Sequence, residues 1–131
     1  MSLSLPRRRL IVAVYTALVL GLTLLPVPDA AWDLVPSWFD KAAHFGLFAT
    51  LGGLLYWEAL SRGQPIPLAV IGPVTVLAGL IELAQGPLPE RSGDPWDVVW
   101  GAAGATVGYW VLRLAARGRG GPEGRSHTGV L

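Results

Sequence analysis

The sequence predicts an all-α membrane protein, a four-transmembrane-helix bundle with both termini in the cytoplasm. Of its 131 residues, 52% are hydrophobic and 15% are charged, whereas a soluble globular chain is about 25% charged. The mean hydropathy of +0.48 agrees with this composition. Two further observations complete the prediction: four long apolar stretches, and an uneven distribution of arginine along the chain.

Composition also excludes several classes of function. The chain has no cysteine, which excludes disulfides, thiolate zinc sites and cysteine nucleophiles. The net charge of +1 gives no indication of nucleic-acid binding. The length suits a single domain.

Each apolar stretch is close to the roughly 20 residues that a helix needs to cross a bilayer. Proline and glycine separate the stretches, because proline removes a helix donor and clashes with the preceding turn. Gly72-Pro73 lies inside the third stretch and predicts a kink there. The expected spans are about Leu10–Leu25, Ala42–Leu60, Ile66–Gln85 and Trp96–Leu114.

A signal peptide is the alternative for the first stretch, since it also has a basic start and an apolar middle. The only cleavage cue is a weak one at Ala30-Ala31, and cleavage would leave three spans. We therefore predict a retained helix. The expected organisation is one membrane domain over residues 1–116, followed by a disordered Gly- and Arg-rich tail over residues 117–131.

The distribution of Lys and Arg predicts the orientation, because these residues favour the cytoplasmic side. With four spans, both termini and the turn near residue 62 share one side. That side holds eight basic residues and the other holds two, Lys41 and Arg91. The eight are Arg7, Arg8, Arg9, Arg62, Arg113, Arg117, Arg119 and Arg125.

Polar residues at the ends of three spans form the candidate site. Ionisable residues in or beside membrane helices are functional candidates, because leaving them unpaired there is costly. Helix residues three or four apart share a face, so Asp40 or Lys41 can lie beside His44, and the other helical pairs have the same kind of spacing. Arg91 lies in the loop before the last pair, and the topology places all of these residues on the outer side. The groups are Asp40, Lys41 and His44; Glu82 and Gln85; and Arg91, Asp94 and Asp97.

Ordinary structural roles are available for most of these residues. Asp40 suits an N-cap. Asp94, which precedes a proline, also suits an N-cap, and Asp97 then complements the helix dipole. Lys41 suits an interfacial position with its stem in the apolar layer. Gln85 can simply end a helix.

His44 and Glu82 are harder to explain in this way. His44 lies one turn inside its helix, although a lone histidine is more often structural than a ligand. Glu82 lies about one turn inside an apolar helix and needs a partner. Glu58, at the opposite end, is expected to pair with Arg62.

Small residues on the fourth span predict close helix packing. Gly104 and Gly108 form a Gly-x-x-x-Gly pair, with Gly101 one turn earlier, and small residues let membrane helices approach. We favour packing inside the bundle over a dimer interface. Gly52, Gly53, Gly72 and Gly79 are further candidates for the same role.

These motifs together resemble the VanZ-like family of small bacterial membrane proteins. The resemblance covers about Leu10 to Leu114. One departure is Gly101, where the family commonly has asparagine. The resemblance itself rests on Asp40-Lys41-Ala-Ala-His44-Phe45, Glu82-Leu-Ala-Gln85, Arg91, Asp97, Gly104 and Gly108.

The resemblance implies a multi-pass protein of the bacterial cytoplasmic membrane, linked to the cell envelope. The founding member of the family is associated with low-level resistance to teicoplanin. The motif positions carried over are Asp40, Lys41, His44, Glu82, Gln85, Arg91 and Asp97.

Three classes of function remain open. The first is binding of an envelope component, such as a lipid head group, a lipid-linked wall precursor or a glycopeptide, with Lys41 and Arg91 meeting an anion. The second is a membrane enzyme with His44 and Glu82 as an acid–base pair. The third is a purely structural ion-pair lock.

Other classes are less favoured by the sequence. Transporter sites usually lie near the midplane, and these residues lie at one face. His44, Glu82 and Asp97 could bind a divalent metal, but no His-x-x-x-His or thiolate pattern supports such a site. We therefore predict no metal or other cofactor and no nucleic-acid partner.

Overall fold

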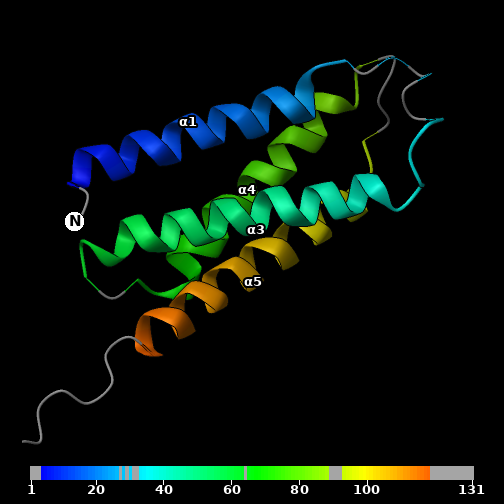
Figure 1. Ribbon diagram of the computed structural model, residues 1–131. Helices are drawn as coiled ribbons and strands as arrows, with labels where there is room; N and C mark the ends of the chain where they lie inside the picture. The colour runs from blue at the N-terminus through cyan, green and yellow to red at the C-terminus, as the bar shows by residue number, and fades with distance from the viewer. Residues whose placement is uncertain are drawn as a thin grey trace, which may run out of the picture.

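The computed structural model describes residues 4–26, 28, 30, 33–63, 65–88 and 93–118. This part of the chain holds four long helices and no strand (Figure 1). The all-α prediction is confirmed, and the helix ends lie within a few residues of those predicted. The helices are α1 (Leu5–Leu24), α3 (Phe39–Leu60), α4 (Pro67–Gln85) and α5 (Pro95–Gly118).

Proline begins several of these helices, where its missing N–H costs nothing. It lies in the first turn of α1 and α4 and is the first residue of α5. Pro73 lies inside α4, which continues through it. Helix α5 extends to Gly118, two residues into the segment predicted as a tail; residues 119–131 lie outside the described part.

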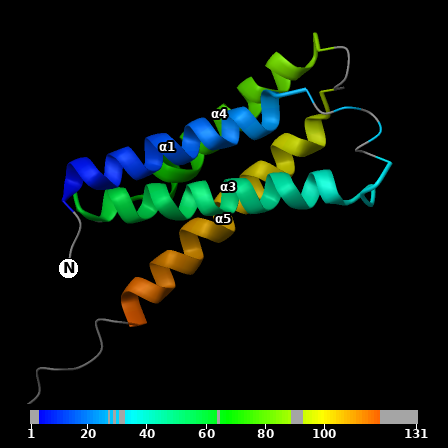
Figure 2. The ribbon, with the colours of Figure 1, turned by 45° about the horizontal axis from the view of Figure 1, so that its top comes forward.

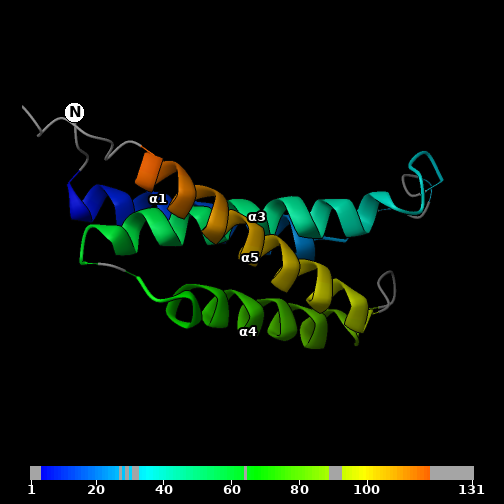
Figure 3. The ribbon, with the colours of Figure 1, turned by 90° about the horizontal axis from the view of Figure 1, so that it is seen from below.

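The four helices run alternately up and down, so that both ends of the described chain lie at one end of the molecule (Figure 1). Helix α1 runs beside α3, and α5 crosses α3 obliquely (Figure 2). Helix α4 lies on the side of α5 away from α1 when seen from below (Figure 3). Helices α3 and α4 each contact the other three helices, and α3 packs most extensively against α5.

Glycines allow the close approach of α3 and α5. An added Cβ at Gly104 or Gly108 would overlap the backbone carbonyl of Phe45 or Ala49, and at Gly52 it would lie 2.6 Å from the Ala105 carbonyl oxygen. The motif therefore serves packing within the chain, as we favoured. Gly72 and Gly79 are different, since an added Cβ there meets only the Leu68 side chain or nothing within 4 Å.

Arginine side chains pack at the end that carries the termini. Arg8 donates to the Trp57 carbonyl oxygen at 2.9 Å, and buried Glu58 pairs with both Arg9 and Arg62. The predicted Glu58–Arg62 pair is confirmed. Because α1 and α3 both supply this pairing, it fixes the start of α1 against the end of α3.

Two helices, α4 and α5, are long and apolar enough to cross a membrane on length and composition among the described residues. Helix α1 begins with three arginines, and α3 carries charged residues near both ends. A large apolar surface is exposed on α1, α4 and α5 together. The opposite end of the molecule from the arginines holds the predicted site.

Candidate functional site

Six of the eight predicted polar residues meet at one end of the molecule, where they form what we call the polar cluster. Helix α3 supplies three members, α4 one, and the start of α5 two. Every neighbouring pair described below lies within 4 Å, so helices far apart in sequence converge on one point. The members are Asp40, Lys41, His44, Glu82, Asp94 and Asp97.

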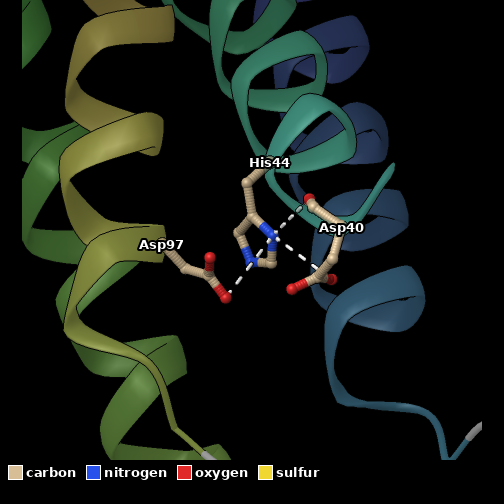
Figure 4. Close-up of side chains that lie close together, drawn as sticks. All are labelled: Asp40, His44 and Asp97. Atoms are coloured by element: carbon tan, nitrogen blue, oxygen red, sulfur yellow. Dashed lines mark hydrogen bonds and ion pairs between the residues drawn. The ribbon is translucent and has the colours of Figure 1, made fainter. Parts of the chain in front are cut away.

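His44 is the centre of the polar cluster and is buried. Its Nδ1 lies 3.7 Å from an Asp40 carboxylate oxygen and 3.9 Å from Asp97 Oδ2 (Figure 4). Its Nε2 lies 3.8 Å from Glu82 Oε1. The ring stacks on Phe48, with centroids 6.1 Å apart. Packing thus holds the imidazole among carboxylates from three helices.

The backbone adds a further contact to the same nitrogen. Nδ1 lies 3.1 Å from the carbonyl oxygen of Asp40, one turn earlier in α3. Which ring nitrogen carries the proton decides whether this contact is a hydrogen bond. Trp38 is the N-cap of α3, and Asp40 lies in the first turn. The interpretation of Asp40 as an N-cap is therefore wrong, because the N-cap lies two residues earlier.

Glu82 connects α4 to the start of α5. Its Oε2 accepts a hydrogen bond of 2.7 Å from the backbone N–H of Asp94, and its Oε1 faces His44. A Cβ at Gly93 would lie 3.0 Å from the Glu82 carbonyl oxygen, so glycine permits this close approach. One carboxylate oxygen of Glu82 therefore has a structural role, while the other points into the polar cluster.

Lys41 pairs with two acidic residues, one at the N-cap of α5 and one in its first turn. Its Nζ donates to Asp94 Oδ2 at 2.8 Å and lies 3.6 Å from Asp97 Oδ1. The Lys41 hydrogen bond, together with the Trp96 backbone N–H, holds the pKa of the Asp94 carboxyl below its usual range. Asp94 Oδ1 also accepts that Trp96 N–H at 3.0 Å, which confirms Asp94 as an N-cap.

Three buried atoms in the polar cluster have no hydrogen-bond partner among the described residues. They are His44 Nε2, Glu82 Oε1 and Asp97 Oδ1. The His44 and Asp97 side chains are each 5% exposed. Buried polar groups are nearly always paired, and an unpaired one costs about 1–3 kcal/mol. The three atoms lie in one cluster and come from three different helices, α3, α4 and α5.

Gln85 does not join the polar cluster, although it was predicted to belong to the site. Gln85 is buried and donates from Nε2 to the Thr23 carbonyl oxygen at 2.6 Å, so it attaches α4 to α1. Thr23 was not singled out by the sequence, and its only signal is a hydroxyl in an apolar stretch. Arg91 lies outside the described residues.

Gly101 packs beneath the polar cluster. A Cβ there would lie 3.1 Å from a Phe48 ring carbon and 3.2 Å from the Ala78 Cβ. An asparagine at this position would have to displace Phe48, on which His44 stacks. Gly101 therefore adds no polar side chain to the polar cluster at the position where the family commonly has asparagine.

The donor set offers two kinds of chemistry. Asp40, His44 and Asp97 each present a ligand atom, and these atoms all lie within 4.8 Å of one another. Separately, the facing His44 Nε2 and Glu82 Oε1 form a potential acid–base pair. Only the second arrangement consists of atoms without a hydrogen-bond partner, since Nδ1 also contacts the Asp40 carbonyl oxygen.

The fold and the polar cluster define a class of small all-α protein, with apolar helices and an ionisable site at one end. The chain belongs to the VanZ/LLP1 family, whose model matches residues 12–116. The matched segment contains the whole polar cluster. No curated protein and no solved structure is similar enough to match the chain.

Proposed function

We propose that this chain is a multi-pass protein of the bacterial cytoplasmic membrane whose polar cluster binds the head group of an envelope amphiphile in the outer leaflet. The observation that carries the proposal is the set of three buried atoms without partners: His44 Nε2, Glu82 Oε1 and Asp97 Oδ1. They come from three helices and belong to one cluster at one end of the apolar helices.

Helix length and charge support four spans with cytoplasmic termini. The helices have 20, 22, 19 and 24 residues, which at 1.5 Å per residue gives about 28–36 Å, enough for a hydrocarbon layer of about 30 Å. The arginine-rich end then faces the cytoplasm. The polar cluster, at the other end, faces outward at the level of the head groups.

The chemistry of the polar cluster favours a head group that donates hydrogen bonds or brings a cation. Four carboxylates surround one histidine and one lysine, and Lys41 already pairs with Asp94. An ammonium or hydroxyl group can donate to the three unpartnered atoms. An anionic group, as first expected from Lys41 and Arg91, needs a cation beside it.

The test is retention of amphiphile by the purified full chain. We would reconstitute it in nanodiscs that contain phosphatidylethanolamine, phosphatidylglycerol or a lipid-linked wall precursor, and count bound molecules by native mass spectrometry. Glu82→Gln gives His44 Nε2 an amide donor and should abolish selective retention. Glu58→Gln, at the opposite end, is the control and should retain the amphiphile. Equal retention by all three proteins would contradict the proposal.

Catalysis is the second candidate, favoured by the 3.8 Å separation of His44 Nε2 and Glu82 Oε1. In that role the pair would serve as acid and base in hydrolysis or transfer at a lipid-linked phosphate or ester. Turnover of such a lipid that is lost in His44→Ala and Glu82→Gln, while binding persists, would favour the enzyme. Teicoplanin sensitivity of cells that carry the same variants is a separate readout for a link to resistance.

A further inference from the structure

We propose that Asp40, His44 and Asp97 bind a divalent transition-metal cation, with Glu82 orienting the imidazole from the other side. The inference shares its location with the proposed head-group site. The inference does not depend on which amphiphile binds, because the test is made in detergent micelles without added lipid. Failure of one proposal therefore leaves the other standing.

The three ligand residues already surround one point. His44 Nδ1 lies 3.7 Å from Asp40 Oδ1 and 3.9 Å from Asp97 Oδ2 (Figure 4). Around a zinc ion with bonds of about 2.0–2.2 Å, neighbouring ligand atoms of a tetrahedron lie about 3.4 Å apart. Closing these two contacts therefore needs movements of about half an ångström. The third distance, between the Asp40 and Asp97 oxygens, lies within 4.8 Å and sets the larger rotation that the two carboxylates must make.

The surroundings of the His44 ring favour a cation at Nδ1. This nitrogen faces oxygen on three sides, since the Asp40 carbonyl oxygen lies 3.1 Å away and the two carboxylates face it as well. If Nδ1 carries the proton, Nε2 and Glu82 Oε1 are left as two facing acceptors, both without a partner. If a cation occupies the Nδ1 side, the proton lies on Nε2 and points toward Glu82.

That second arrangement is the carboxylate–histidine–metal triad found at many metal centres. Glu82 is in turn held by the backbone N–H of Asp94 at 2.7 Å. The cation therefore gives a role to both ring nitrogens and both Glu82 oxygens, which neither neutral tautomer of His44 does.

The excess of negative charge in the polar cluster also favours a bound cation. The polar cluster contains four carboxylates and one lysine, and Lys41 lies on the Asp94 and Asp97 side. Asp97 is buried, with a side chain that is 5% exposed. Uncompensated charge is costly at the edge of an apolar layer. A divalent cation offsets two of these negative charges without a new side chain.

The donor set selects the kind of ion. One imidazole with two carboxylates suits zinc or manganese, whereas calcium and magnesium prefer oxygen donors alone. Three protein ligands leave a further position open, as in zinc sites that bind water or substrate. A phosphate or carboxylate oxygen of a head group would occupy that position, and this last step rests on the proposed function.

The experiment measures Mn²⁺ binding by electron paramagnetic resonance, with Zn²⁺ as competitor. The full chain is used in detergent micelles after chelator treatment, without an affinity tag, and with His127→Ala to remove the second histidine of the sequence. We expect one Mn²⁺ per chain, displaced by Zn²⁺. Asp40→Asn and Asp97→Asn should each weaken binding at least tenfold, and Glu82→Gln by about tenfold, as for other residues that orient a ligand.

Two carboxylates serve as matched controls. Asp33 is exposed in the segment before α3, and Glu58 is buried at the opposite end. Asp33→Asn and Glu58→Gln should leave the affinity unchanged. Far-UV circular dichroism establishes that each variant keeps its helices. Absence of saturable binding in folded wild-type protein, or equal affinity in the Asp40 and Asp97 variants, would overturn the proposal.

Discussion

Two glycine-to-alanine substitutions in different surroundings give the sharpest test of the packing between α3 and α5. At Gly108 an added Cβ overlaps the carbonyl group of Ala49, and at Gly79 it meets nothing within 4 Å. The obstacle at Gly108 is backbone, which cannot rotate away as a side chain can. Helices α3 and α5 would have to separate to admit the methyl group.

The expected magnitudes follow from two opposing effects. Overpacking typically costs about 1–3 kcal/mol, and the backbone obstacle at Gly108 places this site at the upper end. Alanine recovers about 0.8–1.0 kcal/mol in helix propensity, so Gly108→Ala should lose about 2 kcal/mol net of unfolding free energy. Gly79→Ala has only the second effect and should gain up to about 1 kcal/mol.

The assay is reversible unfolding in mixed detergent micelles, followed by far-UV circular dichroism. The two variants should differ by about 3 kcal/mol in unfolding free energy, the sum of the effects above. Equal stability of the two variants would refute the close approach of α3 and α5 at this point.

Two further predictions concern individual contacts, and a third concerns the orientation of the chain. Gln85→Ala removes the buried hydrogen bond to the Thr23 carbonyl oxygen, so it should lower the unfolding free energy by about 1–3 kcal/mol while head-group retention stays unchanged; loss of retention would contradict our separation of Gln85 from the polar cluster. The pKa of Asp94 is lowered, chiefly by Lys41, so the stabilising effect of this carboxylate is present above the ordinary Asp pKa of about 3.9 and is lost as pH falls through the lowered value. Thermal unfolding between pH 2 and 6 should show this loss of stability in the wild type and a smaller loss in Asp94→Asn. Parallel pH curves for the two proteins would argue against the contact. Because the chain has no cysteine, single cysteines report its orientation: an impermeant maleimide should label Asp33→Cys in intact cells and Ser61→Cys only after permeabilisation, and the reverse pattern would invert the topology.

Much of the architecture follows from features that are local in sequence. The helix ends coincide with Pro67, Pro95 and the glycine and proline residues after Gln85, because these residues act on their own turn of backbone. The alternation of the helices then brings Asp40–His44, Glu82 and Asp94–Asp97 to one end. The polar cluster was predictable at this level, from the number and direction of the helices.

The partners of individual side chains were less predictable, since they depend on how each helix is rotated about its axis. Glu82 and Gln85 are three residues apart and share a face. The remaining angle between them is still enough for Glu82 to face His44 while Gln85 reaches Thr23 in α1. In the same way, the pairing of Lys41 with Asp94 rather than with a ligand depends on where α5 starts.

The measurement that tests the central claim most directly is ¹⁵N nuclear magnetic resonance of His44. In the His127→Ala protein His44 is the single histidine, and its Nε2 is one of the three unpartnered buried atoms. If the polar cluster is a ligand site, the ring resonances should shift on addition of Zn²⁺ or of nanodiscs with the retained head group. In Glu82→Gln the shift caused by the head group should be absent, and the shift caused by Zn²⁺ should need about tenfold more zinc. Ring resonances that stay identical in the wild-type cluster under every addition would contradict the claim.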